Sequence, residues 1–114
     1  MDKPDRIRLR HMLDAANEAV SFVEGRSRED LNSDTMLLRA VVKSIEIVGE
    51  AASKLSDSCK SEIHELPWED IIGMRNRLIH AYFRVNRDVV WKTVQEDLPA
   101  LIEILQEVSA SDDL

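Results

Sequence analysis

A ten-residue stretch, MRNRLIHAYF at positions 74–83, carries an unusual density of side chains that could form a chemical site. Arg75, Asn76, His80 and Tyr82 all fall within it. Histidine has a reference pKa of about 6.5 and can take or give a proton near neutral pH. The planar guanidinium of arginine can donate two hydrogen bonds to an anion. The same stretch also has the apolar spacing of a packed helix, so its chemistry depends on where these side chains point.

A helical wheel places one cation among the apolar residues. If residues 71–83 form one helix at about 100° per residue, Arg75 falls in the middle of the apolar arc. A buried guanidinium is costly unless it is paired or faces a polar cleft. Two interpretations follow. Either Arg75 makes a buried, register-fixing ion pair with Glu46 or Glu50 of the preceding helix, or it belongs to a functional site.

The relative placement of Arg75, His80 and Tyr82 is a second difficulty. Residues five apart on a straight helix point about 140° away from each other. Arg75 and His80 can therefore act on one bound group only if the helix ends or distorts near His80, or if the site lies between two copies of the chain. Tyr82 shares the stripe of Arg75, where it is either a core tyrosine or part of the same cleft.

The whole chain has 114 residues, enough for one domain spanning residues 1–114. With only three glycines, three prolines and 4% aromatic residues, helices are favoured over a β-sandwich or barrel. Apolar periodicity predicts helices over residues 4–24, 34–55, 67–82 and 86–108, and a loop with one helical turn over residues 56–66. Pro99 predicts a kink or break, and residues 109–114 a frayed tail.

These elements predict an all-α, antiparallel bundle of four to five helices. The apolar stripes over residues 34–55 and 86–108 are wide for a small domain, so we expect a homodimer. Cys59 is the single cysteine, the sequence starts without an apolar signal segment, and no apolar run is long enough for a membrane span. We therefore expect a cytoplasmic protein. His11, His64 and His80 do not form a credible metal-ligand set, so no cofactor is expected.

The net charge is −7 and the pI about 4.9, which argues against general coating of nucleic acid. Charge is nevertheless uneven: Arg75, Arg77, Arg84 and Arg87 occur within thirteen residues that contain no acid. Such a strip suits an anionic substrate or an acidic partner, and is equally compatible with a solvated surface.

The sequence RNRLIH within this strip matches the Arg-x4-His pattern of HEPN-type ribonucleases, and the following HAY extends it to the Arg-x4-His-x-Tyr form of HepT toxins. The segments SIEIVGEAASKLS, LPWEDIIGMRNRLIHAYFRVNRDVVW and DLPALI also resemble the HepT-like family. The resemblance covers most of the chain from about residue 34 onward.

This resemblance implies a metal-independent ribonuclease toxin in which Arg75 and His80 are catalytic and Asn76 supports them, at a composite site between two protomers. It also implies a minimal nucleotidyltransferase antitoxin as partner, which transfers AMP groups to Tyr82 and so silences the site. Arg77, Arg84 and Arg87 would then contact RNA or the antitoxin. Two alternatives stay open: a catalytically silent HEPN module that binds a nucleotidyltransferase or a nucleotide, and a plain bundle with an Arg75–Glu ion pair.

Overall fold

The computed structural model describes residues 1–79 and 84–112, and within these ranges the protein is an all-α bundle. Ile79 and Val85 form a single isolated antiparallel β-bridge. The helices are α1 (Lys3–Phe22), α2 (Asp30–Ser33), α3 (Thr35–Ser53), α4 (Asp57–Glu62), α5 (Trp68–Ile72), α6 (Met74–Leu78), α7 (Arg87–Lys92), the π-helical segment η2 (Thr93–Asp97) and α8 (Leu98–Asp112).

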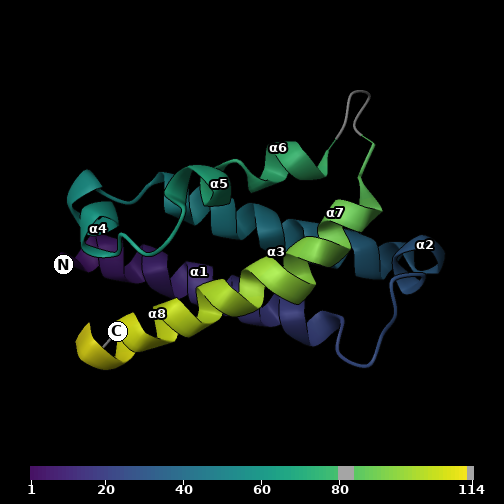
Figure 1. Ribbon diagram of the computed structural model, residues 1–114, viewed down its shortest axis with the longest axis horizontal. Helices are drawn as coiled ribbons and strands as arrows, with labels where there is room; N and C mark the ends of the chain where they lie inside the picture. Colours follow the sequence, from purple (N-terminus) through teal and green to yellow (C-terminus); the bar gives the residue numbers. More distant parts are fainter. Residues whose placement is uncertain (80–83, 113–114) are drawn as a thin grey trace.

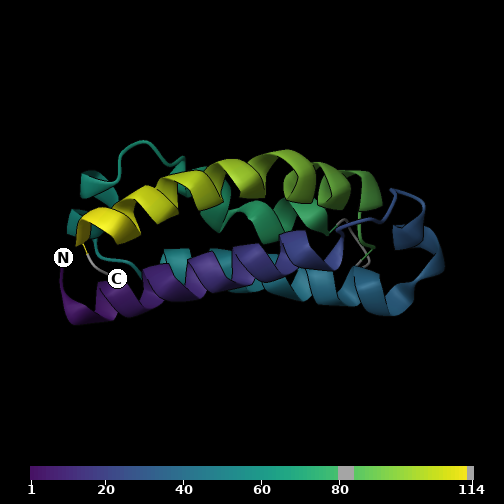
Figure 2. The same cartoon turned by 90° about the horizontal axis from the view of Figure 1, so that it is seen from below.

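The long helices form two layers (Figures 1 and 2). The helices α1 and α3 run antiparallel and pack closely against each other, while α5 and α6 lie on α3 and the continuous helix from α7 to α8 crosses α1. The chain thus passes four times along the length of the molecule, and its two ends lie at the same end (Figure 1). The predicted antiparallel helical bundle is confirmed.

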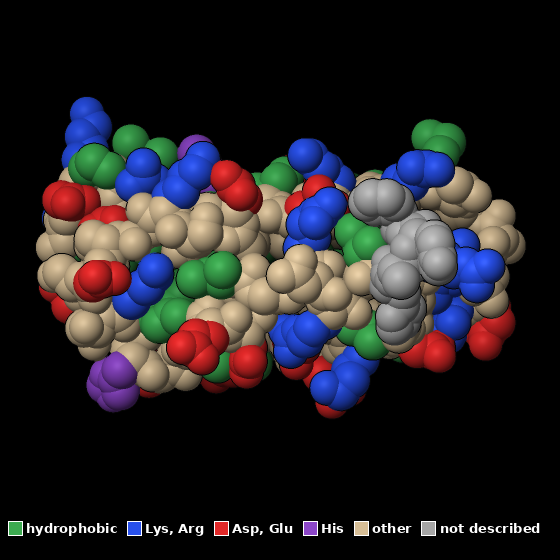
Figure 3. All heavy atoms as spheres, turned by 90° about the horizontal axis from the view of Figure 1, so that it is seen from above, with side chains coloured by type: hydrophobic (Ala, Val, Ile, Leu, Met, Phe, Trp, Pro, Cys, Tyr) green, Lys and Arg blue, Asp and Glu red, His purple; other side chains and the backbone are tan. Residues whose placement is uncertain are grey.

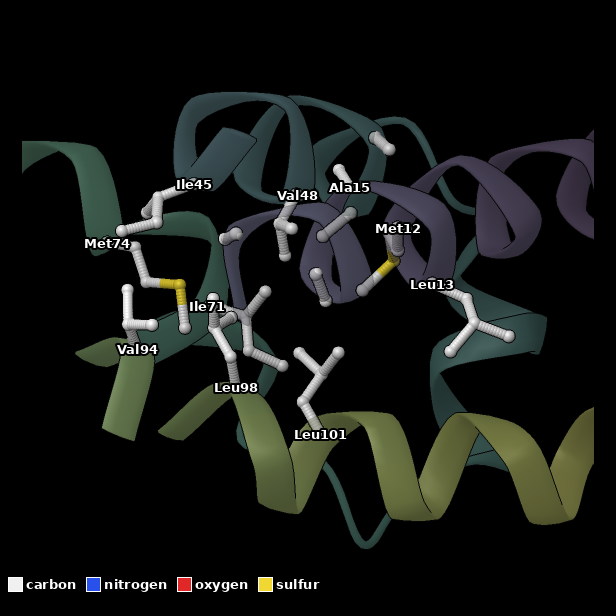
Figure 4. Packing of buried hydrophobic residues seen from close by; sticks show 14 of the residues in the cluster. Met12, Leu13, Ala15, Ile45, Val48, Ile71, Met74, Val94, Leu98 and Leu101 are labelled. Carbon is white, nitrogen blue, oxygen red and sulfur yellow. The ribbon is translucent and has the colours of Figure 1, made fainter. Parts of the chain in front are cut away.

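The core forms where the predicted apolar stripes face one another. In Figure 4, Met12 of α1, Val48 of α3, Ile71 of α5 and Leu98 and Leu101 of α8 converge on the same space. All five are almost fully buried. Periodicity of three and four residues therefore placed the core faces of these helices correctly.

Two predicted helix starts are confirmed by their caps. The Asp34 side chain accepts a hydrogen bond from the Leu37 amide at 3.1 Å, and the Asn86 side chain accepts one from the Val89 amide at 3.2 Å. Each cap satisfies an amide that the first helical turn would leave unpaired. Pro67, predicted at the first helical position, instead precedes it, and α5 begins at Trp68.

The prediction of a break at Pro99 is wrong. The chain stays helical from α7 through α8, and its wider π turns, residues 93–97, lie just before the proline. An i→i+5 segment shifts the hydrogen-bond register at the point where proline lacks an amide, which lets the helix continue. The prediction of a frayed tail is also wrong for residues 109–112, which continue α8. The Ser111 hydroxyl donates a hydrogen bond to the Glu107 carbonyl at 2.9 Å within this last turn.

A buried carboxylate ties the start of α1 to α4. The amide and hydroxyl of Ser56 donate to Asp5 at 3.0 and 2.6 Å, and the Ser56 hydroxyl also accepts from the Cys59 amide at 3.1 Å. Burial disfavours the charge of Asp5, but the hydrogen bonds from Ser56 outweigh burial and lower its pKa. Burial, with the nearby charge of Asp5, raises the pKa of the Cys59 thiol to about 11, so this cysteine stays a protonated core residue.

Among the described residues, none of the helices combines the length and apolarity that a membrane crossing requires. The described residues also contain no group of three or more His, Cys, Asp or Glu side chains placed to hold a metal ion.

Candidate active site

The segment that was predicted to form one helix over residues 67–82 is instead two short helices. Gly73 separates α5 from α6: its amide donates to the Glu69 carbonyl at 2.9 Å and its carbonyl accepts from the Arg77 amide at 3.3 Å. Helix α5 lies tightly on α3, since a Cβ added at Gly49 would come 3.3 Å from the Ile71 carbonyl oxygen. Gly49 therefore permits the close approach that fixes α5 and, through it, α6.

Helix α6 ends before the histidine of the motif. Ile79 has extended backbone angles and forms the β-bridge with Val85, and the Asn86 amide donates to the Leu78 carbonyl at 2.6 Å. These contacts bring Leu78 and Ile79 next to Val85 and Asn86. Arg75 and His80 could converge either because the helix ends near His80 or because the site lies between two copies of the chain. The first condition is met, since α6 ends at Leu78. His80 and Tyr82 themselves lie outside the described residues.

Arg75 is not buried, contrary to the wheel. Its side chain is 55% exposed, and its Nε lies 3.6 Å from Oε1 of Glu46, whose side chain is 29% exposed. Glu46 is thus the partner, whereas Glu50 pairs with Lys54 at 3.1 Å. The pair lies at the surface between α3 and α6, so a buried, register-fixing tie is excluded in this structure.

The wheel failed because it counted residues beyond the end of α6 as helical. The side chains of Ile71, Met74 and Leu78 are buried, and they centre the real apolar arc near 330°, with Ile71 taken as zero. Arg75 then lies roughly 70° away, at the edge of the arc. Asn76, one residue further round, is exposed.

The other arginines of the strip divide into two kinds. Arg77 donates to the Asp70 carbonyl at 2.9 Å, and Arg87 donates through Nε to the Leu31 carbonyl at 3.2 Å, so both bind backbone of neighbouring helices. Arg84 is exposed and lines a groove between α3 and residues Ile79, Val85 and Arg87. The strip is therefore not a uniform solvated surface.

That groove has a volume of about 740 Å³, and we refer to it as the basic groove. Four cations line it, Arg39 and Lys43 of α3 with Arg84 and Arg87 opposite, and Glu46 is the one acid in its lining as far as the described residues show. Figure 3 shows several Lys and Arg side chains on the face of the molecule that it presents. Sequence reasoning missed Arg39 and Lys43, although their spacing of four residues places them on one face of α3.

A second groove of about 710 Å³ lies between α1 and α3, and Arg75 is part of its wall. We refer to it as the α1–α3 groove. Glu46 and Lys43 line both grooves, so the two adjoin at the Arg75–Glu46 pair. The arrangement can present an exposed, oriented guanidinium to an anion that lies across this junction.

The fold and the site define a class of small helical proteins in which the arginine of an Arg-x4-His motif is exposed on a short helix that ends at Leu78. The family model described as ribonuclease HepT-like matches residues 12–108, which is most of the chain. The chain belongs to the HepT-like ribonuclease family.

Curated relatives agree with this assignment. A protein of Caldanaerobacter subterraneus subsp. tengcongensis named "Putative RNase TTE0752" is 38% identical over 93% of this chain and 95% of its own length. The "Probable ribonuclease HepT" of Thermococcus cleftensis is 41% identical over 74% of this chain and 80% of its own. "Putative RNase MJ1380" of Methanocaldococcus jannaschii is 31% identical over 82% and 85%. No solved structure matches the chain.

Proposed function

We propose that this protein is a metal-independent endoribonuclease and the toxin of a toxin–antitoxin pair. The observation that carries the proposal is the placement of Arg75: it is exposed at the junction of two grooves and held by Glu46 rather than buried in the core. Membership of the HepT-like ribonuclease family supports RNA as the substrate. In this proposal Arg75 and His80 are catalytic, and Asn76 supports them.

The proposed reaction needs no reagent beyond the RNA and the protein. The ribose 2′-oxygen attacks the adjacent phosphorus while its proton is removed, the bond from phosphorus to the 5′-oxygen breaks, and that oxygen is protonated. His80 would serve one of these proton transfers. The guanidinium of Arg75 would donate hydrogen bonds to the phosphorane oxygens, where negative charge accumulates. The products would be a 2′,3′-cyclic phosphate and a 5′-hydroxyl.

The decisive experiment uses purified protein whose mass shows an unmodified Tyr82. The parent, His80→Ala and Arg75→Ala are each incubated with total tRNA and with mRNA in EDTA. We expect cleavage by the parent alone, with cyclic-phosphate ends on the 5′ fragments. If folded parent and variants are equally inert, the catalytic proposal fails and the silent binding module replaces it. Cleavage that requires added metal would overturn metal independence.

Regulation would act at the same site. We propose that a nucleotidyltransferase antitoxin transfers AMP from ATP to the Tyr82 hydroxyl, which attacks the α-phosphorus and displaces pyrophosphate. The added phosphates would compete with RNA for Arg75. Coexpression with the nucleotidyltransferase should add one or more AMP groups to the peptide that contains Tyr82 and abolish cleavage. The Tyr82→Phe variant should stay unmodified, and modification elsewhere with unchanged cleavage would contradict this role.

A further inference from the structure

We propose that the basic groove binds the phosphates of the RNA strand next to the one that is cleaved, with Arg39 and Lys43 as its principal contacts. The inference rests on the proposed ribonuclease function, and it assigns a substrate-binding role to two residues outside the Arg-x4-His motif. We assign a nucleic-acid strand, rather than an acidic protein, as the ligand of the groove.

The first observation is the charge of the groove. Arg39, Lys43 and Arg84 are exposed, and within the described ranges none of them has a carboxylate within 4.0 Å. Unpaired cations in a shared groove are unexpected in a protein of net charge −7, where acids are abundant. Their mutual repulsion is relieved when an anion binds among them.

The second observation is that the groove leads to the candidate catalytic residue. Glu46 lines the groove and is also the partner of Arg75, at 3.6 Å. A strand that follows the basic groove toward Glu46 therefore reaches Arg75 without leaving the surface. An acidic protein would require no such continuity, and this is why we assign the groove to the substrate.

The third observation is the length of the groove along α3. Thr35 and Glu46 both line it, and eleven residues of α-helix span about 16 Å. This is several times the roughly 3.4 Å rise of one nucleotide along a helical strand. Arg39 and Lys43 lie within this length, one helical turn apart, so they can contact different phosphates.

The anchoring of the opposite wall is the fourth observation. Arg87 is fixed by its hydrogen bond from Nε to the Leu31 carbonyl, and the adjacent Asp88 pairs with Arg28 at 2.7 Å. The start of α7 is thereby tied to the segment around α2. A groove with two anchored walls loses little conformational freedom when it binds a strand.

The test compares Arg39→Gln/Lys43→Gln with the control Arg10→Gln/Lys92→Gln, which removes the same charge at exposed positions outside both grooves. Binding is measured with a single-stranded 2′-deoxy oligonucleotide, which has the same phosphates and no 2′-hydroxyl to react. We expect the groove variant to bind more weakly and its slope of log K against log salt to shrink by about 1.4, at about 0.7 per phosphate contact. The control variant should match the parent in both respects.

Cleavage kinetics provide a second measurement. Contacts to phosphates that do not react bind the ground state and the transition state alike, so the groove variant should raise KM with little change in kcat. If the groove variant equals the parent in binding or in KM, the inference is overturned. It is also overturned if the parent does not bind the oligonucleotide, and an acidic protein would then be the expected ligand of the groove. Because binding is measured without cleavage, an inert parent that still binds through the groove would refute only the ribonuclease proposal.

Discussion

At the scale of single residues, the exposure of Arg75 argues against a structural role in the core. Removing one partner of a buried ion pair lowers the free energy of unfolding by about 3–5 kcal/mol, whereas an exposed pair contributes at most about 1 kcal/mol to it. Arg75 and Glu46 belong to the second kind, with side chains 55% and 29% exposed. The guanidinium is held in place without being needed by the core.

We therefore predict that Arg75→Ala lowers the free energy of unfolding by less than about 1 kcal/mol while it abolishes RNA cleavage. Urea denaturation followed by circular dichroism measures the first quantity, and the EDTA cleavage assay the second. Glu46→Gln is the matched control for stability, because it breaks the same pair and leaves the guanidinium present. A loss of several kcal/mol in Arg75→Ala would restore the register-fixing pair as its main role.

The sequence identified the residue types of the site but not their surroundings. The motif, the two candidate partners Glu46 and Glu50, and the helix starts near Asp34 and Asn86 could all be read from residue types and spacing. The exposure of Arg75 could not, because a wheel assumes one continuous helix and cannot detect that Ile79 leaves it. Arg39 was missed for a different reason: its role depends on which segment lies opposite α3, and this is a tertiary contact.

At the scale of secondary-structure elements, stability and pH are linked through Asp5. This carboxylate accepts two hydrogen bonds from Ser56, the cap of α4, and so joins α1 to α4. Its pKa is lower in the folded protein than the ordinary 3.8. The unfolded chain therefore binds more protons between these two pKa values, and the free energy of unfolding rises with pH in that interval.

We predict that the stabilisation from Asp5 is fully present above about pH 4 and is lost as the pH falls through the lowered pKa. Asp5→Asn should reduce the free energy of unfolding by about 1–3 kcal/mol at pH 7 and less at lower pH, because only the charged acceptor is removed. Urea titrations between pH 7 and pH 2.5 measure both effects. Asp14→Asn, at an exposed position of the same helix, is the control; an equal loss there would contradict the assignment.

The sequence did not predict α2, the division of residues 67–82 into α5 and α6, or the π-helical turns. Helices α2 and α6 are four and five residues long, too short for a periodic apolar pattern to identify them. The π-helical turns before Pro99 accommodate its missing amide, and apolar periodicity alone does not distinguish such turns from a break in the helix. Long helices with a full stripe, by contrast, were found with their buried faces correct.

At the scale of the whole molecule, the α1–α3 groove is the surface on which we expect a second copy to pack. Ile7 of α1 is 47% exposed, Ile47 of α3 is 37% exposed, and both line this groove together with Arg75. Large apolar side chains gathered in one groove favour a protein partner. A second copy seated there would lie beside Arg75, which is what a catalytic site shared between two protomers requires.

We predict that the parent has the mass of two chains in analytical ultracentrifugation and that Ile47→Glu has the mass of one. Burying the new carboxylate in an apolar interface would carry a large free-energy cost of desolvation. The same variant should lose RNA cleavage while its circular dichroism spectrum stays that of a folded helical protein, because Ile47 is already partly exposed within one chain. Ile72→Glu is the matched control: its side chain is also 37% exposed, and it lies outside both grooves. An Ile47→Glu dimer would place the interface elsewhere, and a parent that cleaves RNA as a monomer would show that one copy of Arg75 and His80 is sufficient.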